Sequence, residues 1–353
     1  MERFLSAPGK LFLSGEYAVL WGGTARIAAV GPRTHAQVRR RPDREVHVVL
    51  EGGRLAGQIT PLGVNWGGPV PQPFRFAARA IGEAVRAHGK EDLGLELALS
   101  PSPAADGKKL GLGGSARAAV LAAEATRYVL EERVDALKLA LLSHALEQGM
   151  RGSGGDVAAI FAGGLVRYRR YPVELLERAA SQGQLRSGLL SAPPVDLWRV
   201  PAERTFLAYA FCGDSASTEQ MIRKAERTLS GDERRAFVER SDDLGDQLER
   251  ALVEGDFRAV REAAGGLRAL LSQVGAETDA AKQILALAES HGAAGKTSGA
   301  GGGDVCVLFS PDEAARSRVL EALAARGIFA RAAPLEAGLR GEAKLDASLA
   351  NWL

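Results

Sequence analysis

One segment of the sequence is the most informative about the fold: Lys109-Leu110-Gly111-Leu112-Gly113-Gly114-Ser115-Ala116. It lies between a strand-like run and an alanine-rich run that continues through Leu130 with strong helix propensity. Its glycines allow backbone N–H groups to turn toward a ligand, and the following helix would present its positive N-terminal end. The segment therefore predicts an anion site suited to nucleotide phosphates, with the Ser115 hydroxyl placed to bind Mg²⁺.

An ordinary glycine-rich turn is the alternative interpretation of this segment. The segment does not fit the usual P-loop pattern Gly-x-x-x-x-Gly-Lys-Ser/Thr. It is also a poor dinucleotide-binding fingerprint, because no second βαβ unit with a suitably spaced acid follows it. The functional interpretation therefore depends on the rest of the chain.

A second glycine-rich segment, residues 148–157, reads Gln-Gly-Met-Arg-Gly-Ser-Gly-Gly-Asp-Val. It places Asp156 at the start of another alanine-rich helix. An aspartate at this position is either a helix N-cap or a carboxylate that contacts the group being phosphorylated. In the second case Asp156 would act as a base or as a positioning group.

Two further segments flank these in the chain. Residues 298–304 read Ser-Gly-Ala-Gly-Gly-Gly-Asp, so a ligand could approach the backbone closely; the alternatives are a hairpin or a linker. The apolar run after this segment favours an ordered loop.

Near the N-terminus, Pro8-Gly9-Lys10 precedes a strand-like run and Gly15-Glu16-Tyr17 follows it. Lys10 is either a surface lysine or a cation that neutralises developing phosphate charge.

The residue patterns along the chain predict an α+β protein in two halves, which we assign to residues 1–195 and 196–353. Strands are expected at 11–13, 25–30, 36–39, 46–50, 93–99, 163–171, 206–211, 305–309 and 328–332. Helices are expected at 74–88, from 115 to 130, at 134–148, after 155, and at 218–229, 232–253, 256–272, 278–291 and 311–326. Residues 178–204, with three prolines, are expected to be irregular.

Composition excludes several classes of protein. The net charge of +2 argues against a nucleic-acid-binding protein, which usually carries a strong basic excess. No apolar run approaches the ~18 residues of a membrane span, and the first seven residues are too polar for a signal peptide, so we expect a cytoplasmic protein without a membrane partner.

Cys212 and Cys306 lie in apolar runs and are expected to be reduced and buried. Either a monomer or a homodimer is compatible with the sequence.

In their order along the chain, these segments resemble the motifs of the GHMP kinase superfamily, which includes galactokinase, homoserine kinase, mevalonate kinase and phosphomevalonate kinase. Residues 7–17 resemble the first motif, residues 111–116 the second and residues 298–304 the third. The resemblance implies a two-domain GHMP kinase fold. Its N-terminal domain would be of the ribosomal protein S5-like type, its C-terminal domain ferredoxin-like, and the active site would lie between them.

Four details within the superfamily are similar to the phosphomevalonate kinases: residues 9–17, Lys109, residues 148–158, and the hydroxyl-rich residues 213–218. This likeness implies ATP-dependent phosphorylation of phosphomevalonate to diphosphomevalonate, in the mevalonate route to isoprenoids, with ATP and Mg²⁺ as cofactors. Three alternatives stay open: a mevalonate kinase, a mevalonate-diphosphate decarboxylase, and a non-catalytic ligand sensor that kept the fold.

The resemblance also assigns roles to individual residues. The expected catalytic residues are Lys10, Lys109 and Asp156, and the expected metal contact is Ser115. The expected ATP-binding residues are Lys109, Gly111, Leu112, Gly113, Gly114, Ser115 and Ala116. The expected substrate-binding residues are Lys10, Glu16, Tyr17, Arg151, Ser153, Gly154, Asp156, Ser215, Ser217, Thr218, Gly301 and Gly302. The second motif usually reads Gly-Leu-Gly-Ser-Ser-Ala; here Gly114 replaces the first serine and Arg117 follows Ala116.

Arginines are the other expected feature of the site. Phosphomevalonate would bring a carboxylate and a phosphate beside the triphosphate of ATP, so the pocket must be cationic, and arginine suits both groups. Arg151, Arg167, Arg169 and Arg170 lie next to or shortly after the second segment. For Arg169 and Arg170 the alternative is a solvated surface charge.

Overall fold

The computed structural model describes residues 2–50, 52–88, 94–102, 104–105, 107–130, 135–202, 205–213, 217–344 and 346. Within these residues the larger sheet has nine strands, in the order β10-β9-β2-β6-β3-β4-β5, with β1 paired to β2 and to β15. The strands are β1 (Glu2–Ser14), β2 (Thr24–Arg41), β3 (Glu45–Leu50), β4 (Gly53–Thr60), β5 (Gly63–Asn65), β6 (Gly94–Leu99), β9 (Leu165–Arg169), β10 (Leu197–Val200) and β15 (Arg340–Glu342).

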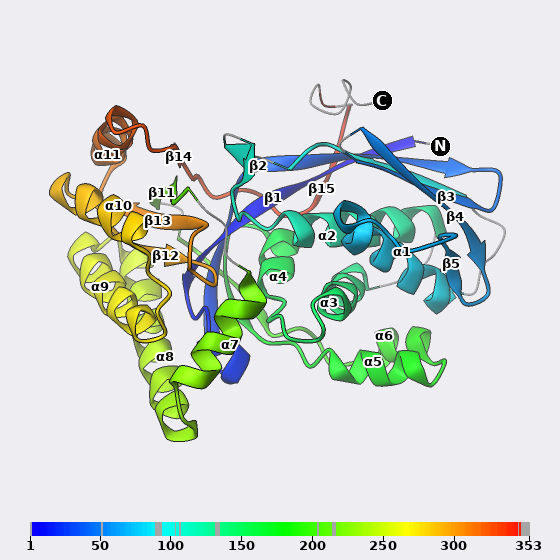
Figure 1. Ribbon diagram of the computed structural model, residues 1–353, viewed down its shortest axis with the longest axis horizontal. Coiled ribbons are helices and arrows are strands. Elements are labelled where there is room, and N and C mark those ends of the chain that lie inside the picture. The colour runs from blue at the N-terminus through cyan, green and yellow to red at the C-terminus, as the bar shows by residue number, and fades with distance from the viewer. Residues whose placement is uncertain are drawn as a thin grey trace.

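Helices cover one face of this sheet (Figure 1). They are α1 (Arg75–His88), α2 (Gly114–Leu130), α3 (Ala136–Glu147) and α4 (Gly155–Ala162), with α5 (Glu174–Ser181) and α6 (Leu185–Ser191) beyond them. Alternate strand residues, such as Val46 and Val48 of β3 and Leu97 of β6, form one hydrophobic core with these helices. The period of two therefore sends the residues between them to the opposite face.

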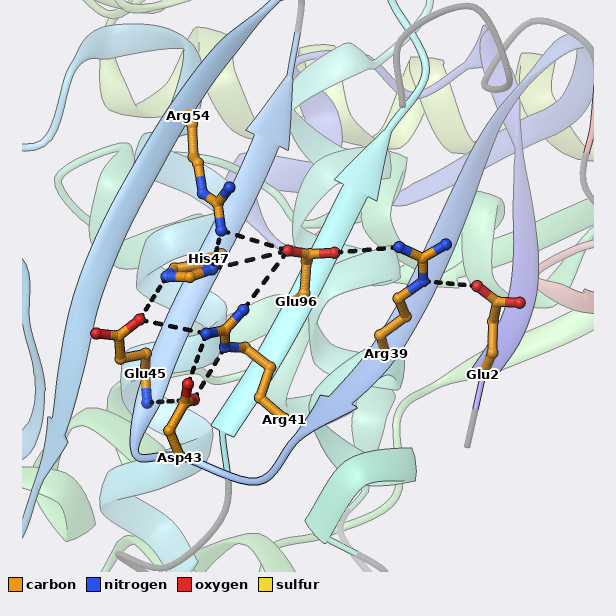
Figure 2. A network of polar contacts seen from close by, with 8 residues as sticks. All are labelled: Glu2, Arg39, Arg41, Asp43, Glu45, His47, Arg54 and Glu96. Carbon is orange, nitrogen blue, oxygen red and sulfur yellow. Dashed lines mark hydrogen bonds and ion pairs between the residues drawn. The ribbon is translucent and has the colours of Figure 1, made fainter.

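That opposite face carries a network of charged side chains (Figure 2). The Glu96 carboxylate lies 3.6 Å from a guanidinium nitrogen of Arg39, 3.5 Å from one of Arg54 and 3.7 Å from Nδ1 of His47. Arg41 joins it to Asp43 and Glu45. Such half-exposed pairs contribute little stability individually, but charged residues at these positions keep the sheet in its observed register.

A second, antiparallel sheet has the strand order β12-β13-β11-β14. It is formed by β11 (Phe206–Phe211), β12 (Ala294–Ser298), β13 (Val305–Ser310) and β14 (Ala330–Ala332). The helices of this half are α7 (Thr218–Thr228), α8 (Gly231–Glu254), α9 (Phe257–Gln273), α10 (Asp279–Ser290) and α11 (Glu313–Ala325). Short elements complete the described chain: β7 (Ala104–Ala105), β8 (Lys108–Lys109) and the 3₁₀ turns η1 (Ala18–Trp21) and η2 (Gln72–Phe74).

Both faces of the second sheet are buried. Leu207 and Phe211 of β11 pack on α8 and α9 in a core that also contains Leu11 of β1. Ala208 and Ala210 face the other way, toward α10 and α11. Because the first of these cores includes residues of both sheets, the two halves are packed directly against each other.

Most of the predicted elements are confirmed, and the differences have physical causes. Residues 7–10 were expected to form a turn before a strand at 11–13, but they lie inside β1, where the pairing with β2 shifts register between Ala7 and Gly9. The runs 25–30 and 36–39 belong to one strand, β2. Residues 178–204 are not irregular: they contain the end of α5, all of α6, and β10, which pairs with β9. For β1, β2 and β10, pairing with strands distant in sequence overrides the turn signals of proline and glycine.

The proposed division at residue 196 remains a prediction. The larger sheet takes β10 from just beyond this boundary and β15 from near the C-terminus. The chain therefore returns to the N-terminal half after it completes the second sheet, and there β15 pairs with β1 (Figure 1).

Cys212 and Cys306 are free and buried as expected, and their sulfur atoms lie 3.7 Å apart. The adjacent Cys212 thiol and burial both raise the pKa of Cys306, which keeps it protonated. None of the helices in the described ranges is both long enough and apolar enough to cross a bilayer.

Candidate active site

A cleft with a cavity volume of about 450 Å³ lies where the three glycine-rich segments meet. Its lining includes Lys10 of β1, the loop from Lys109 to Ser115, Asp156 of α4, Thr218 of α7, and Gly299, Ala300 and Asp304 of the third segment. Segments that lie far apart in the sequence thus face one space. In particular, the glycine-rich loop and the Asp156 carboxylate share this cleft, as the sequence predicts.

The loop has the geometry of an anion-binding turn. Gly111 and Gly113 have φ angles of 68° and 85°, and α2 begins at Gly114. A side chain at either position would be strained by the positive φ angle, and a Cβ on Gly111 would lie 2.6 Å from Cγ of Asp304, which leaves no room for it. A Cβ on Gly113 would make a tight contact of 3.1 Å with Cγ of Lys10. The first N–H groups of α2 therefore remain available at the cleft.

Lys10 supports the loop through two hydrogen bonds. Its backbone N–H donates to the carbonyl oxygen of Leu112 at 3.1 Å, and its Nζ donates to that of Gly111 at 2.9 Å. The side chain is 8% exposed, so its charge is held in one place beside the loop. Lys109, in contrast, is exposed at the edge of the cleft.

Asp156 lies in the first turn of α4, where the helix dipole favours a carboxylate. It is not the N-cap, because that position is taken by Gly154 with a φ angle of 75°. Asp156 Oδ1 accepts a hydrogen bond from the N–H of Val157 at 2.9 Å, and its other oxygen lies 3.7 Å from Nε2 of His144. The carboxylate is thus fixed in direction while still lining the cleft.

His144 of α3 is a site residue that the sequence did not reveal. Its Nε2 lies 3.2 Å from Oγ of Ser115, so one ring contacts both Ser115 and Asp156. Its ring lies against Phe76, with centroids 5.0 Å apart. Burial lowers the pKa of His144, more strongly than Asp156 raises it, so the ring is neutral at neutral pH. No motif surrounds His144; only the packing of α3 against α2 and α4 shows its place.

The oxygens of Ser115 and Asp156 fit a magnesium ion in character, since Mg²⁺ prefers hydroxyl, carboxylate, phosphate and water oxygens. Both residues line the cleft and are linked through His144. Among the described residues no group of three or more His, Cys, Asp or Glu side chains could hold a metal. Phosphate oxygens of a bound nucleotide would therefore have to complete the coordination.

Glu16 and Tyr17 also line the cleft, but their polar atoms are engaged within the protein. The Glu16 carboxylate forms an ion pair with Nζ of Lys296, and both side chains are almost fully buried. Lys296 also donates to the carbonyl oxygen of Thr297 at 2.7 Å. The Tyr17 hydroxyl donates to the carbonyl oxygen of Ala300. These contacts tie the first motif to the third, and Lys296 is the second site residue that the sequence analysis missed.

Replacing Lys296 by Met should lower the free energy of unfolding by about 3–5 kcal/mol, because it leaves the buried Glu16 carboxylate without its cation. Urea unfolding measures the difference. The matched control is Lys282→Met, which removes an exposed pair with Asp279 and should leave the free energy of unfolding nearly unchanged. Equal effects of the two substitutions would show that the buried pair has no special role.

Several predicted site residues are not among those that line the cleft. Ala116 is buried inside α2, Gly154 packs beside Leu141, and Gly301 and Gly302 lie against Ala276. Ser217 is the exposed N-cap of α7. Ser215 is outside the described residues. From the third segment it is Gly299, Ala300 and Asp304 that reach the cleft.

The arginines expected to make the pocket cationic are bound elsewhere. Arg151 pairs with Glu219 at 3.4 Å, Arg167 lies near Glu249 at 3.8 Å, Arg169 donates to Oγ1 of Thr24 and Arg170 pairs with Glu174. None of these four arginines lines the cleft. Arg167 and Arg169 alternate along β9 and so share one face of that strand, and Arg170 follows its end. The cations that line it are Lys10, Lys109 and Arg117.

Comparison with known proteins identifies the family. Residues 76–164 match the GHMP kinases N terminal domain, and residues 248–328 match the GHMP kinases C terminal domain. Over 343 residues the chain is 31% identical to a phosphomevalonate kinase of Streptomyces sp. (strain CL190), covering 88% of this chain and 90% of that protein. It is 26% identical to a mevalonate kinase of Aeropyrum pernix, again covering 88% of this chain and 90% of that one.

A solved structure has the same fold. The phosphomevalonate kinase of Streptococcus pneumoniae, in complex with phosphomevalonate and AMPPNP, superposes with a TM-score of 0.78 at 22% identity, covering 93% of this chain and 99% of that one. The two domain matches and the Streptomyces relative agree with the order of the motifs and with their convergence on one cleft. The chain belongs to the GHMP kinase family.

Proposed function

We propose that this protein is an ATP-dependent kinase that transfers the γ-phosphoryl group of ATP to the terminal phosphate of phosphomevalonate. The observation that carries this proposal is the shared cleft of the glycine-rich loop and Asp156. The 31% identical relative is a phosphomevalonate kinase, and the similar Streptococcus structure holds phosphomevalonate and AMPPNP. Both support phosphomevalonate as the acceptor and ATP as the donor.

The proposed transfer forms a bond between the γ-phosphorus and an oxygen of the acceptor phosphate, while the bond to the β,γ-bridging oxygen breaks and ADP leaves. N–H groups of the loop would hold the β- and γ-phosphates, and Lys10 would offset the charge that develops on the leaving oxygen. Magnesium, bound by Ser115 and the phosphates with Asp156 close by, would add further charge neutralisation when present.

Asp156 has a positioning role in this proposal. The acceptor is already a phosphate and is ionised at neutral pH, so it needs little deprotonation. Its oxygen must instead be aligned with the γ-phosphorus, and a carboxylate held by Val157 and approached by His144 has a defined direction for this. His144, being neutral, would orient Ser115 and Asp156 without adding charge.

Mevalonate is the second candidate acceptor, because several relatives at lower identity, including the 26% identical Aeropyrum protein, are mevalonate kinases. A mevalonate kinase would use the same cleft but would have to deprotonate a hydroxyl, and Asp156 would then serve as the base.

ADP release measured with phosphomevalonate, mevalonate, homoserine and galactose distinguishes these acceptors. We expect rapid, acceptor-dependent ADP release with phosphomevalonate alone. Faster release with mevalonate would replace the proposed acceptor. ATP binding without ADP release for any of the four would instead favour a ligand sensor, and release of carbon dioxide from mevalonate diphosphate would indicate a decarboxylase.

A further inference from the structure

Arg117 is a buried cation without an anionic partner. It lies in the first turn of α2 and is 2% exposed. Its Nη1 donates to the carbonyl oxygen of Pro32 at 3.0 Å, and its Nε has no partner. Burial lowers the pKa of Arg117 to about 10, so the guanidinium stays charged at neutral pH. Within the described part of the chain, no carboxylate pairs with it.

Arg26 shows what such burial normally requires. It is equally buried, and its guanidinium pairs with Asp246 and, at 3.1 Å, with Glu249. Leaving a charge buried and uncompensated costs several kcal/mol, which is why buried charges are usually paired. The difference between the two arginines indicates that the counter-charge of Arg117 comes from outside the chain.

The position of Arg117 says where that counter-charge would bind. Arg117 lines the cleft, and its Nη2 lies 3.9 Å from the place that a Cβ on Gly114 would occupy. The same Cβ would lie 2.9 Å from Oγ of Ser102, so the glycine at 114 lets Ser102 and Arg117 lie close to the N-terminus of α2. Thr34 lines the cleft as well, and its hydroxyl is buried without a partner. Unpaired polar groups thus gather beside the N-terminus of α2.

We propose that Arg117 binds a phosphate group of the nucleotide beside Gly114, whereas Lys10 contacts the loop at Gly111 and Leu112. The inference rests on the proposed nucleotide-dependent function. Guanidinium nitrogens donate to phosphate oxygens in a fork that matches their geometry, and the N–H groups of α2 point to the same anion. The nucleotide is the more suitable partner, because Arg117 lies beside Gly114 at the N-terminus of α2, where the loop would hold its phosphates.

Titration calorimetry with Mg·ADP on the full chain tests this inference. In Arg117→Met the Kd for ADP should rise about 10- to 100-fold, as expected for loss of a charged hydrogen bond. The KM for ATP should rise with it, while the KM for phosphomevalonate stays unchanged. Arg117→Lys, which keeps the charge but loses the fork, should give an intermediate Kd.

Thermal unfolding without ligand separates this role from a structural one. Because the substitution removes an unpaired buried charge, the Tm of Arg117→Met should not fall below that of the wild type. The matched control is Arg316→Met. Arg316 is a largely buried arginine of α11 that pairs with Glu313, so its loss should lower the Tm and leave the Kd for ADP unchanged.

Each outcome bears on a different claim. An unchanged Kd for ADP in folded Arg117→Met overturns the inference, and so does a higher KM for phosphomevalonate with unchanged ADP binding. If the wild type binds ADP through Arg117 but transfers phosphate to no acceptor, the proposed function fails and the inference stands. A wild type that does not bind ADP at all would overturn both.

Discussion

Replacing Asp156 by Asn is expected to lower kcat by about 10²- to 10⁴-fold, the range typical of a group that takes part in proton transfer or alignment at the reacting centre. The amide keeps the size of the carboxylate and its place in the first turn of α4 but removes the negative charge. Because in the proposed complex the nucleotide phosphates are held by the N-terminus of α2 and by Lys10, and not by Asp156, the Kd for ADP should stay unchanged. Steady-state kinetics together with calorimetry measures both quantities.

The exposed Asp279, remote from the cleft in α10, provides the control for this experiment. Asp279→Asn should leave kcat and ADP binding at wild-type values. Full activity of Asp156→Asn would reject the role of Asp156. A loss of ADP binding that matches the loss of kcat would assign Asp156 to the nucleotide site instead.

The second large effect is expected for Lys10→Met. This substitution keeps much of the buried stem but removes the charge that contacts the Gly111 carbonyl. Loss of one preorganised cation at the transferring phosphate typically costs about 10²- to 10³-fold in kcat. The KM for ATP should rise as well, because the same charge supports the loop in the ground state.

Lys224→Met is the matched control for Lys10, since Lys224 is an exposed lysine that also donates to a backbone carbonyl, that of Gly275. It should have wild-type kinetics. If Lys10→Met lowers the Tm but leaves kcat unchanged, Lys10 supports the fold of the loop and takes no part in the transfer. Activity restored by Lys10→Arg would show that the charge alone is sufficient.

The strongest local patterns in the sequence were enough to predict much of the fold. The alanine-rich run after Ser115 and the long amphipathic helices between 218 and 291 form where they were expected, because helix propensity and packing agree there. β12 was missed: Ala294-Gly-Lys-Thr-Ser has little intrinsic preference for a strand. It forms one because it pairs along its whole length with β13.

The residues of the candidate site also fall into two groups, those with a local signal in the sequence and those without one. The loop at Gly111–Ser115, Lys10 and Asp156 could be found because glycines and charges at fixed spacings have a local meaning. His144 and Lys296 could not, since their roles depend on partners more than ten residues away, Ser115 and Asp156 for one and Glu16 for the other. Arg167 and Arg169 of β9 were expected at the site because they follow Asp156 closely in sequence. They do not line the cleft, so nearness in sequence was a poor guide here.

Phosphorus NMR of the reaction mixture, with ATP and phosphomevalonate as the only phosphates added, tests the proposed transfer most directly. The account predicts that the phosphomonoester resonance of the acceptor is replaced by two mutually coupled resonances of an organic diphosphate, in step with conversion of ATP to ADP. An unchanged acceptor resonance with ATP left intact would contradict it, and so would conversion of mevalonate to a phosphomonoester in a parallel mixture while phosphomevalonate stays unchanged.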